Sequence, residues 1–196
     1  MLQSFLVSTS LVALAEVGDK TQLLSLILAA RYRKPLPIML GVLVATLVNH
    51  ACAGGVGALL ADLLNPKILN WLIVASFVLM SGWILIPDKL DEDEVSLPKR
   101  AMGVFATTVV VFFLAEMGDK TQVVTIALAA RYQDYFSVVA GTTIGMMLAN
   151  VPVIYLGSRF AERLPTRKVH LLAAAIFVVL GLLALHHAVT TTPLWG

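Results

Sequence analysis

Two copies of one charged octet stand out in this sequence. Residues 15–22 read AEVGDKTQ, and 100 positions later residues 115–122 read AEMGDKTQ. Each copy lies within an apolar run long enough to cross a bilayer, where ionisable side chains are costly and usually mark an ion or proton pathway. The two octets are therefore the candidate functional site.

Carboxylate, hydroxyl and amide oxygens make up the candidate ligand set. These oxygens suit hard cations such as Mg²⁺, Ca²⁺ or Mn²⁺, and the octets lack the thiolate and imidazole ligands that select Zn²⁺ or Cu⁺. On a continuous helix Glu16, Asp19 and Lys20 would share one face, although Gly18 could let the helix open locally. The candidate metal ligands are Glu16, Asp19, Thr21 and Gln22 in the first octet and Glu116, Asp119, Thr121 and Gln122 in the second.

The charge of the two octets favours an exchange of metal for protons. Four carboxylates and the protonated Lys20 and Lys120 leave a net charge of minus two, which one divalent cation or two protons would neutralise. Because crowded, buried carboxylates bind protons more tightly and a metal competes with those protons, this predicts cation/proton antiport. A simpler interpretation pairs Glu16 with Lys20 at helical spacing, which would leave Asp19 outside the pair.

Polar residues of the following apolar segments could complete the site. Asn49 and His50 lie near the middle of one segment, and Asn150 lies close to the equivalent point in the second half. Hydrogen bonding between helices explains the asparagines equally well, and His50, which has no counterpart, could carry a proton. The accessory candidates are Lys20, Lys120, Asn49, Asn150 and His50.

The composition indicates an integral membrane protein. Of the 196 residues, 59% are hydrophobic and 13% charged, and the mean hydropathy is +0.88. Soluble domains are about half apolar and about a quarter charged. We expect an all-α fold with six transmembrane helices, the first of which is retained because no basic residue precedes it as in a signal peptide. The six apolar segments are 3–30, 36–61, 68–87, 101–130, 136–158 and 169–189.

The second half of the chain repeats the first without a gap over more than forty residues, so that LAARY at 28–32 returns at 128–132. Because each repeat holds three spans, the second must enter the membrane from the opposite side, which predicts inverted-topology repeats. We expect three-helix repeats over 1–87 and 101–196, joined by an acidic linker over 88–100, with the octets facing one another. Close helix packing is predicted at Gly54, Gly55, Gly57, Gly141 and Gly145.

The distribution of basic residues predicts the orientation. Ten of the fourteen Lys and Arg residues lie in the loops after the first, third and fifth segments, and two, Lys67 and Arg131, lie on the other side. By the positive-inside rule the richer side is cytoplasmic, so that both termini lie outside and the linker lies in the cytoplasm. The clustered acidic residues of this linker are typical of a solvated connection.

The duplicated Glu-x-Gly-Asp-Lys-Thr motif, one copy per three-helix repeat, resembles the signature of the Golgi-type calcium/manganese-proton antiporter family. The resemblance covers the whole chain, which looks like a compact bacterial member of the manganese-exporter branch. It implies a secondary transporter of the bacterial inner membrane that exports Mn²⁺, with Ca²⁺ as a second candidate, in exchange for protons. The acidic positions of the motif correspond to Glu16, Asp19, Glu116 and Asp119.

Two other functions stay open at this stage. An exporter of a small organic cation or amino acid could share the two three-helix repeats, and an intramembrane hydrolase could use Asp19 and Asp119 as a dyad. Symmetric octets with adjacent lysines fit ion binding better, so we expect a transporter and not an enzyme, with no cofactor. The expected partners are a divalent metal ion, protons and the lipid bilayer, without nucleic acid; the oligomeric state is open, a homodimer included.

Overall fold

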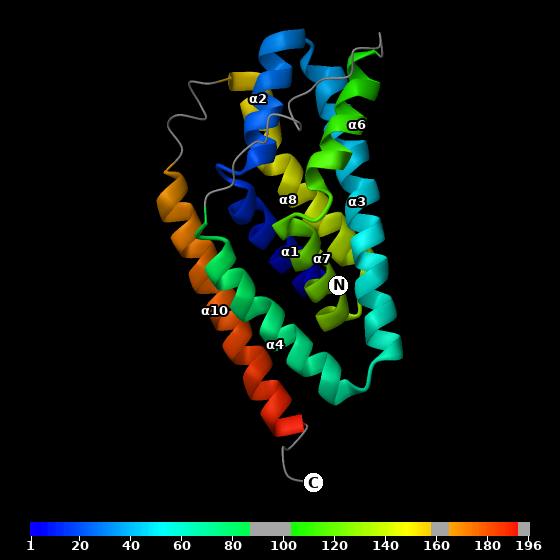
Figure 1. Ribbon diagram of the computed structural model, residues 1–196, viewed down its shortest axis with the longest axis vertical. Helices are drawn as coiled ribbons and strands as arrows, with labels where there is room; N and C mark the ends of the chain where they lie inside the picture. The colour runs from blue at the N-terminus through cyan, green and yellow to red at the C-terminus, as the bar shows by residue number, and fades with distance from the viewer. Residues whose placement is uncertain (87–102, 158–164, 192–196) are drawn as a thin grey trace.

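The computed structural model is all-helical and describes residues 1–86, 103–157 and 165–191. Within these residues the helices form an elongated bundle (Figure 1). They are α1 (Leu2–Glu16), α2 (Lys20–Tyr32), α3 (Pro35–Leu63), α4 (Pro66–Trp83), α6 (Val104–Glu116), α7 (Lys120–Tyr132), α8 (Tyr135–Leu156) and α10 (Thr166–Thr191). The expected acidic linker, 88–100, lies outside the described residues.

Each octet interrupts a helix. The segment expected over 3–30 forms α1 and α2, and the segment expected over 101–130 forms α6 and α7. At the breaks Gly18 and Gly118 have φ angles of +83° and +76°, a conformation that favours glycine. The expectation that Glu16, Asp19 and Lys20 share one helical face is wrong, because Asp19 has extended backbone and the other two lie on different helices.

The two halves of the chain cross the bundle in opposite directions (Figure 1). In this view α1 and α2 run upward whereas α6 and α7 run downward. The following helices are also opposed, since α3 runs downward and α8 upward, and α4 runs upward and α10 downward. Helices at equivalent positions of the duplicated sequence are thus antiparallel.

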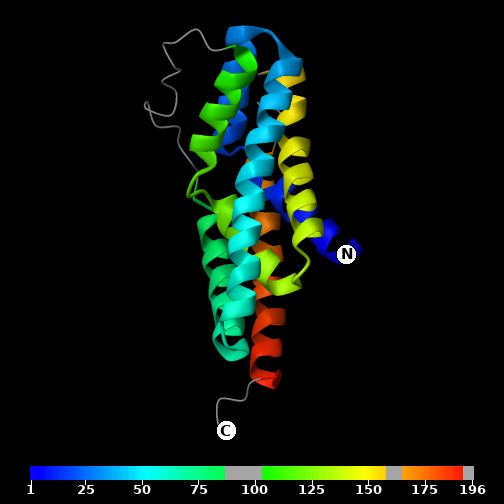
Figure 2. The same ribbon diagram turned by 90° about the vertical axis from the view of Figure 1, so that its right-hand side faces the viewer.

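Helices of the two halves also interleave (Figure 2). α1 packs against α8, α3 packs against α6 and α7, and α4 packs against α10. A Cβ atom on Gly145 of α8 would lie 2.6 Å from the carbonyl oxygen of Thr9 in α1, and a Cβ on Gly57 of α3 would meet the carbonyl oxygen of Ile126 in α7. Small residues allow such close approach of backbones. The predicted glycine packing is confirmed here, but it is wrong for Gly55, beside which a Cβ would meet nothing within 4 Å.

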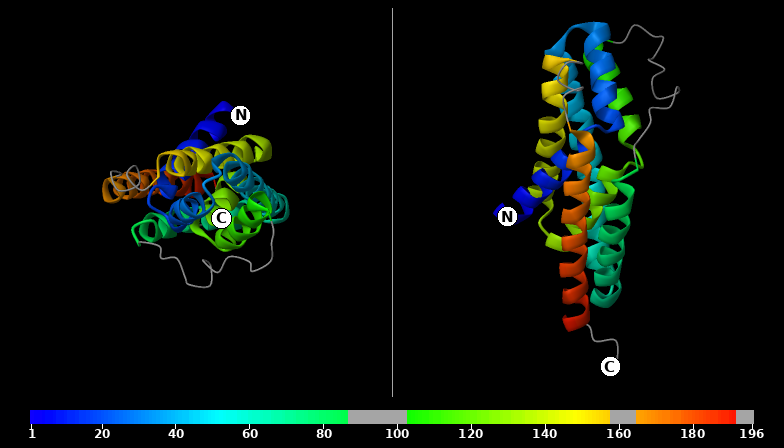
Figure 3. Two further views of the ribbon diagram at one scale, coloured as in Figure 1. Left: turned by 90° about the horizontal axis from the view of Figure 1, so that it is seen from above. Right: turned by 90° about the vertical axis from the view of Figure 1, so that its left-hand side faces the viewer.

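α4 and α10 cover only one part of this bundle. α4 packs against α7 and α10 against α1, and the rings of Phe77 and Phe177 in this core have centroids 6.3 Å apart. A second core around Phe112 joins α2, α3, α6 and α8, and among the described residues it includes none from α4 or α10. The right-hand view of Figure 3 shows α4 and α10 beside the lower part of the bundle, with α2 above them.

The surface of the bundle is apolar, unlike that of a protein that folds in water. Large apolar side chains such as Leu79, Leu148 and Leu182 are exposed, whereas Glu16 and Glu116 are fully buried. α3, α4, α8 and α10 are long and apolar enough to cross a membrane, and α1 and α6 are shorter apolar helices. The chain is therefore an integral membrane protein, because lipid is the solvent in which such a surface is stable.

The contact at Gly145 predicts a loss of stability on adding one methyl group. We expect Gly145→Ala to lower the free energy of unfolding by about 1–3 kcal/mol, since the added Cβ would overlap the backbone of α1. The matched control is Gly55→Ala, because a Cβ at Gly55 enters open space. Thermal unfolding in detergent measures both variants, and equal unfolding midpoints would contradict the packing described here.

Candidate cation site

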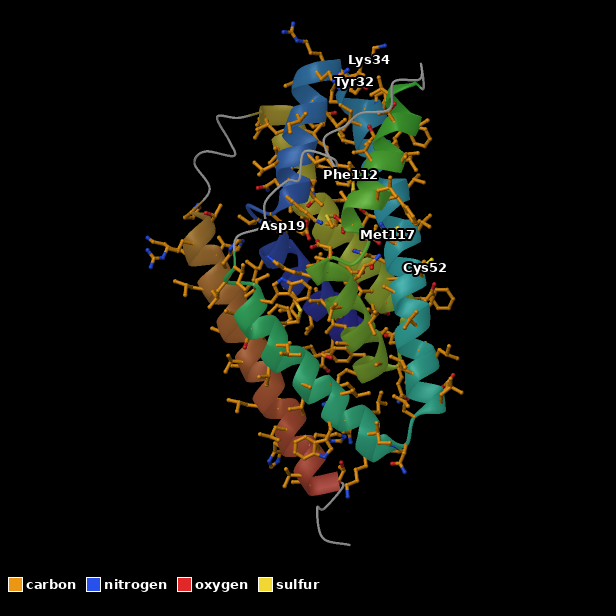
Figure 4. The ribbon with its side chains drawn as sticks, in the orientation of Figure 1. Asp19, Tyr32, Lys34, Cys52, Phe112 and Met117 are labelled. Carbon is orange, nitrogen blue, oxygen red and sulfur yellow. The ribbon has the colours of Figure 1, made fainter. Side chains whose placement is uncertain are left out.

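The two helix breaks bring carboxylates of both octets together. Asp19 of the first break and Met117 of the second lie at the same level, near mid-height of the bundle (Figure 4). Ligand oxygens of Glu16, Glu116 and Asp119 lie within 4.8 Å of one another, and all three residues are buried. Two oxygens on opposite sides of a hard cation, each about 2.3–2.6 Å from it, would be about 5 Å apart. The three carboxylates can therefore contact one cation together.

Mutual repulsion makes this cluster unstable without added positive charge. Two unit charges 4.8 Å apart repel by roughly 3.5 kcal/mol at an effective dielectric constant of about 20. Three carboxylates contain three such pairs, and their burial removes the water that would screen them. The cluster therefore needs a metal ion, protons or neighbouring ammonium groups to neutralise it.

The threonine of each octet holds the glutamate of the same octet. Thr21 Oγ1 donates a hydrogen bond to Glu16 Oε2 over 2.5 Å, and Thr121 Oγ1 donates one to Glu116 Oε2 over 3.1 Å. The other oxygen of Glu116 is buried and has no hydrogen-bond partner within the described part of the chain. Such an oxygen is costly to bury unless a ligand, a proton or water satisfies it. The threonines thus orient carboxylates and leave an oxygen of Glu116 for a ligand.

The glutamine of each octet supports the broken backbone. The amide nitrogen of Gly18 donates to Gln22 Oε1, that of Gly118 donates to Gln122 Oε1, and both distances are 2.9 Å. These bonds satisfy backbone N–H groups that a continuous helix would have paired within itself. The side-chain oxygens of Gln22 and Gln122, predicted from the sequence as cation ligands, therefore accept hydrogen bonds from the two turns.

The neighbouring helices reach these glutamines in different ways. Asn49 Oδ1 in α3 accepts a hydrogen bond from Gln122 over 3.2 Å, whereas the backbone oxygen of Ala149 in α8 accepts one from Gln22 over 2.9 Å. Asn150, one position beyond strict repeat spacing, instead accepts a hydrogen bond from Ser25 of α2. Both asparagines join helices, which is the structural alternative considered for them.

The accessory His50 is buried in α3 beside Asn49. Within the described residues neither of its ring nitrogens has a hydrogen-bond partner. Among the described residues His50 therefore makes no hydrogen bond to the carboxylate cluster, and a proton-carrying role stays a prediction.

Lys120 of the second octet faces a carboxylate of the first octet. Lys120 Nζ lies 3.8 Å from Asp19 Oδ1 and donates a hydrogen bond to the carbonyl oxygen of Ile86 over 3.0 Å. Only 3% of Lys120 is exposed, whereas Lys20 is partly exposed. Charge neutralisation thus crosses between the two octets.

Sequence reasoning missed His170. Its Nε2 atom donates to the carbonyl oxygen of Val17 over 2.6 Å, so that α10 contacts the first helix break directly. The position that corresponds to it in the first half is Asn70, so a lone histidine in one repeat was the available signal. A cavity of about 480 Å³ lies beside this contact and is lined by Gly18, Leu85, Thr166, Arg167, His170 and Leu171.

An all-helical membrane protein with a buried acidic cluster at paired helix breaks has the construction of an ion transporter. The model of one protein family, described as divalent cation/proton antiporter GDT1, matches residues 4–92 and 104–192. The chain belongs to the GDT1 family of divalent cation/proton antiporters. The resemblance drawn from the duplicated motif is confirmed.

Several curated relatives support the family assignment. A protein of Vibrio cholerae named "Putative manganese exporter" is 51% identical over 177 residues, which are 90% of this chain and 87% of that protein. The Saccharomyces cerevisiae protein named "Divalent cation/proton antiporter GDT1" is 23% identical over 97% of this chain and 86% of its own length. A rice protein named "GDT1-like protein 3" is 25% identical over 91% of this chain and 72% of its own. No solved structure matches the chain.

The two break glycines predict unequal effects of one substitution. We expect Gly18→Ala and Gly118→Ala each to cost about 1–3 kcal/mol of stability, because both glycines have positive φ. Gly18→Ala should cost more, since its Cβ would lie 2.5 Å from Thr166 Cγ2, whereas a Cβ at Gly118 would meet nothing within 4 Å. Thermal unfolding of the purified variants measures the difference, and a larger loss at Gly118 would refute it.

Proposed function

We propose that the protein is a secondary active transporter that exports Mn²⁺, with Ca²⁺ as a second substrate, from the cytoplasm in exchange for protons. The observation that carries the proposal is the convergence of Glu16, Glu116 and Asp119, whose ligand atoms lie within 4.8 Å of one another. Membership of the GDT1 family supports a divalent cation and protons as the exchanged ions. The name of the Vibrio relative supports Mn²⁺ as the metal.

Charge balance explains why the two ions would exchange. The four acidic residues of the octets carry four negative charges and Lys20 and Lys120 two positive ones, so that minus two remains. One divalent cation or two protons restores neutrality, and a buried site without either is disfavoured by carboxylate repulsion. The metal leaves when protons arrive from the other side, and transport in one direction drives transport in the other.

The proposed ligands are Glu16, Asp19, Glu116 and Asp119. Thr21 and Thr121 would orient the two glutamates, and Gln22 and Gln122 would hold the turns, as their hydrogen bonds indicate. The cavity beside Gly18 does not favour an organic cation as the substrate, because Arg167 and His170 line it. A metal ion held by carboxylates is the better-supported cargo.

The topology that fits this function has six spans in two inverted repeats, over residues 1–87 and 101–196. α1 with α2 and α6 with α7 would form the first span of each repeat, and α3, α4, α8 and α10 would form the others. The opposite directions of equivalent helices in Figure 1 support this arrangement. An inverted repeat places equivalent groups around one central site, which alternating access requires.

The proposed location is the bacterial inner membrane, with both termini outside. Arg31, Arg33 and Lys34 lie at the end where α2 meets α3, the upper end in Figure 4, on which Lys34 is labelled. Lys67 and Arg131 are the basic residues near the opposite end, at the start of α4 and the end of α7. The positive-inside rule assigns the upper end to the cytoplasm.

Transport in proteoliposomes tests the function. An imposed proton gradient should drive Mn²⁺ movement in the opposite direction, and Glu16→Gln and Glu116→Gln should each reduce the rate by about a hundredfold or more, because losing a group that only supports a metal ligand already costs about 10–100-fold. Asp62→Asn is the matched control, because Asp62 is exposed near the end of α3 and should transport as the wild type does.

The same assay can contradict the proposal. Wild-type protein of verified fold that moves neither Mn²⁺ nor Ca²⁺ under either gradient would reject the metal as substrate. Glutamine variants that retain the wild-type rate would reject the paired carboxylates as the site.

Thiol labelling tests the orientation. In a Cys52→Ser background, which removes the single cysteine, Arg131→Cys should react with a membrane-impermeant maleimide applied outside intact spheroplasts. Lys34→Cys should react only after the membrane is permeabilised, because its end of the bundle is assigned to the cytoplasm. The reverse pattern would show that the orientation is inverted.

A further inference from the structure

We propose that Lys120 is a tethered counter-ion of Asp19, that is, a positive charge on Asp19 that is also hydrogen-bonded to the end of α4. Lys120 competes with the transported cation for Asp19, and its displacement releases the end of α4 from the site. The inference rests on the proposed function, because the competing cation is the cargo. It assigns to one lysine of a duplicated pair a coupling role that the sequence repeat alone does not suggest.

The contacts of Lys120 join three elements. Lys120 is the first residue of α7, and its ammonium group lies 3.8 Å from Asp19 Oδ1 at the start of α2. The same group donates to the carbonyl oxygen of Ile86, just beyond the C-terminus of α4, over 3.0 Å. One buried side chain therefore connects the second octet, an acidic residue of the first octet and the residues that directly follow α4.

The end of α4 is itself packed onto the site. Ile84 is fully buried and clusters with Ala15 of α1 and with Ala173 and Ala174 of α10. α10 in turn contacts the first break through the hydrogen bond from His170 to the carbonyl oxygen of Val17. α4 and α10 thus contact the two octets at this end. The contact of Lys120 with Ile86 joins α4 to a charged group of the candidate site.

Lys120 and a metal ion would compete for the same oxygen of Asp19. A divalent cation held by Asp19 would stand within a few ångströms of the ammonium group, and like charges at that separation repel strongly in a buried site. Asp19 Oδ1 would also change partner from ammonium to metal. Cation binding therefore displaces Lys120 and breaks its hydrogen bond to Ile86.

Lys20 does not have the same surroundings, although the two octets differ at a single position. α4 packs against α7, which begins with Lys120, whereas α10, the equivalent of α4, packs against α1. Lys20 is also partly exposed, whereas Lys120 is buried. The repeated motif thus does not give its two lysines the same neighbours.

Metal binding to the purified, full-length protein tests the competition. We expect Lys120→Met to bind Mn²⁺ about tenfold more tightly than the wild type in isothermal titration calorimetry, because a buried competing charge is removed. Lys67→Met, which removes an exposed lysine at the start of α4, should change the affinity by less than about threefold, since an exposed charge is screened. Lys120→Arg, which keeps the charge, should bind nearly as the wild type does, and it verifies that the site tolerates substitution.

Release of α4 is tested by labelling a cavity residue. Leu171 lines the cavity beside Gly18, so the thiol of Leu171→Cys in a Cys52→Ser background reports how open this end is. In otherwise wild-type protein Mn²⁺ should raise the rate of maleimide labelling. In the Lys120→Met variant the rate should already be raised without Mn²⁺ and should not respond to it, whereas Lys67→Met should behave as the wild type.

The outcomes separate the two proposals. Equal effects of Lys120→Met and Lys67→Met, or weaker Mn²⁺ binding by Lys120→Met, would overturn the tethered counter-ion. A labelling rate of metal-free Lys120→Met equal to that of metal-free wild type would overturn the link to α4, whatever the protein transports. If the wild-type protein binds no Mn²⁺ but metal-free Lys120→Met is still labelled faster than metal-free wild type, the proposed substrate is overturned. The contact between Lys120 and the end of α4 is then still supported.

Discussion

Repulsion between buried carboxylates is the constraint on which the rest of this structure depends. Glu16, Glu116 and Asp119 place their oxygens within 4.8 Å of one another, in the interior of a bundle whose surface is apolar. The surrounding structure reduces the negative charge of this region in two ways, through hydrogen bonds from threonines to the two glutamates and through Lys120, which reaches Asp19 of the opposite octet. Repulsion among the three carboxylates remains, and it would favour binding of a cation or of protons.

The sequence predicted the helical membrane fold and the residues of the cluster, because charges within apolar runs and an exact duplication are strong signals. It did not predict the helix breaks. A glycine tolerates both a helix and a turn, and the choice depends on distant groups, such as the carbonyl oxygen of Ala149, which holds Gln22 against the turn at Gly18. The sequence predicted Gln22 as a cation ligand, because neither its residue type nor its spacing reveals the hydrogen bond to Ala149.

Near-identical octets have different surroundings in this structure. Gly18 packs against Thr166 and lies beside His170, whereas a Cβ at Gly118 would meet nothing within 4 Å. The difference arises because α4 and α10 cover the core of α1 and α7 and leave the equivalent core around Phe112 to other helices. A repeated sequence describes each half alike, so its pattern could not predict on which side the two outer helices would pack.

The interleaving of the halves has a consequence for how the chain is made. α1 finds its main neighbour in α8, and α3 finds its neighbours in α6 and α7, so the first half leaves the ribosome before its packing partners exist. An aspartate at the centre of a lone helix in lipid costs about 2.5–3.5 kcal/mol. During synthesis Glu16 and Asp19 therefore enter the bilayer before the groups that later surround them, and the protonated form is the less costly one. The first octet is thus inserted as a weak acid, and the candidate cation site is complete only after the second octet has been inserted.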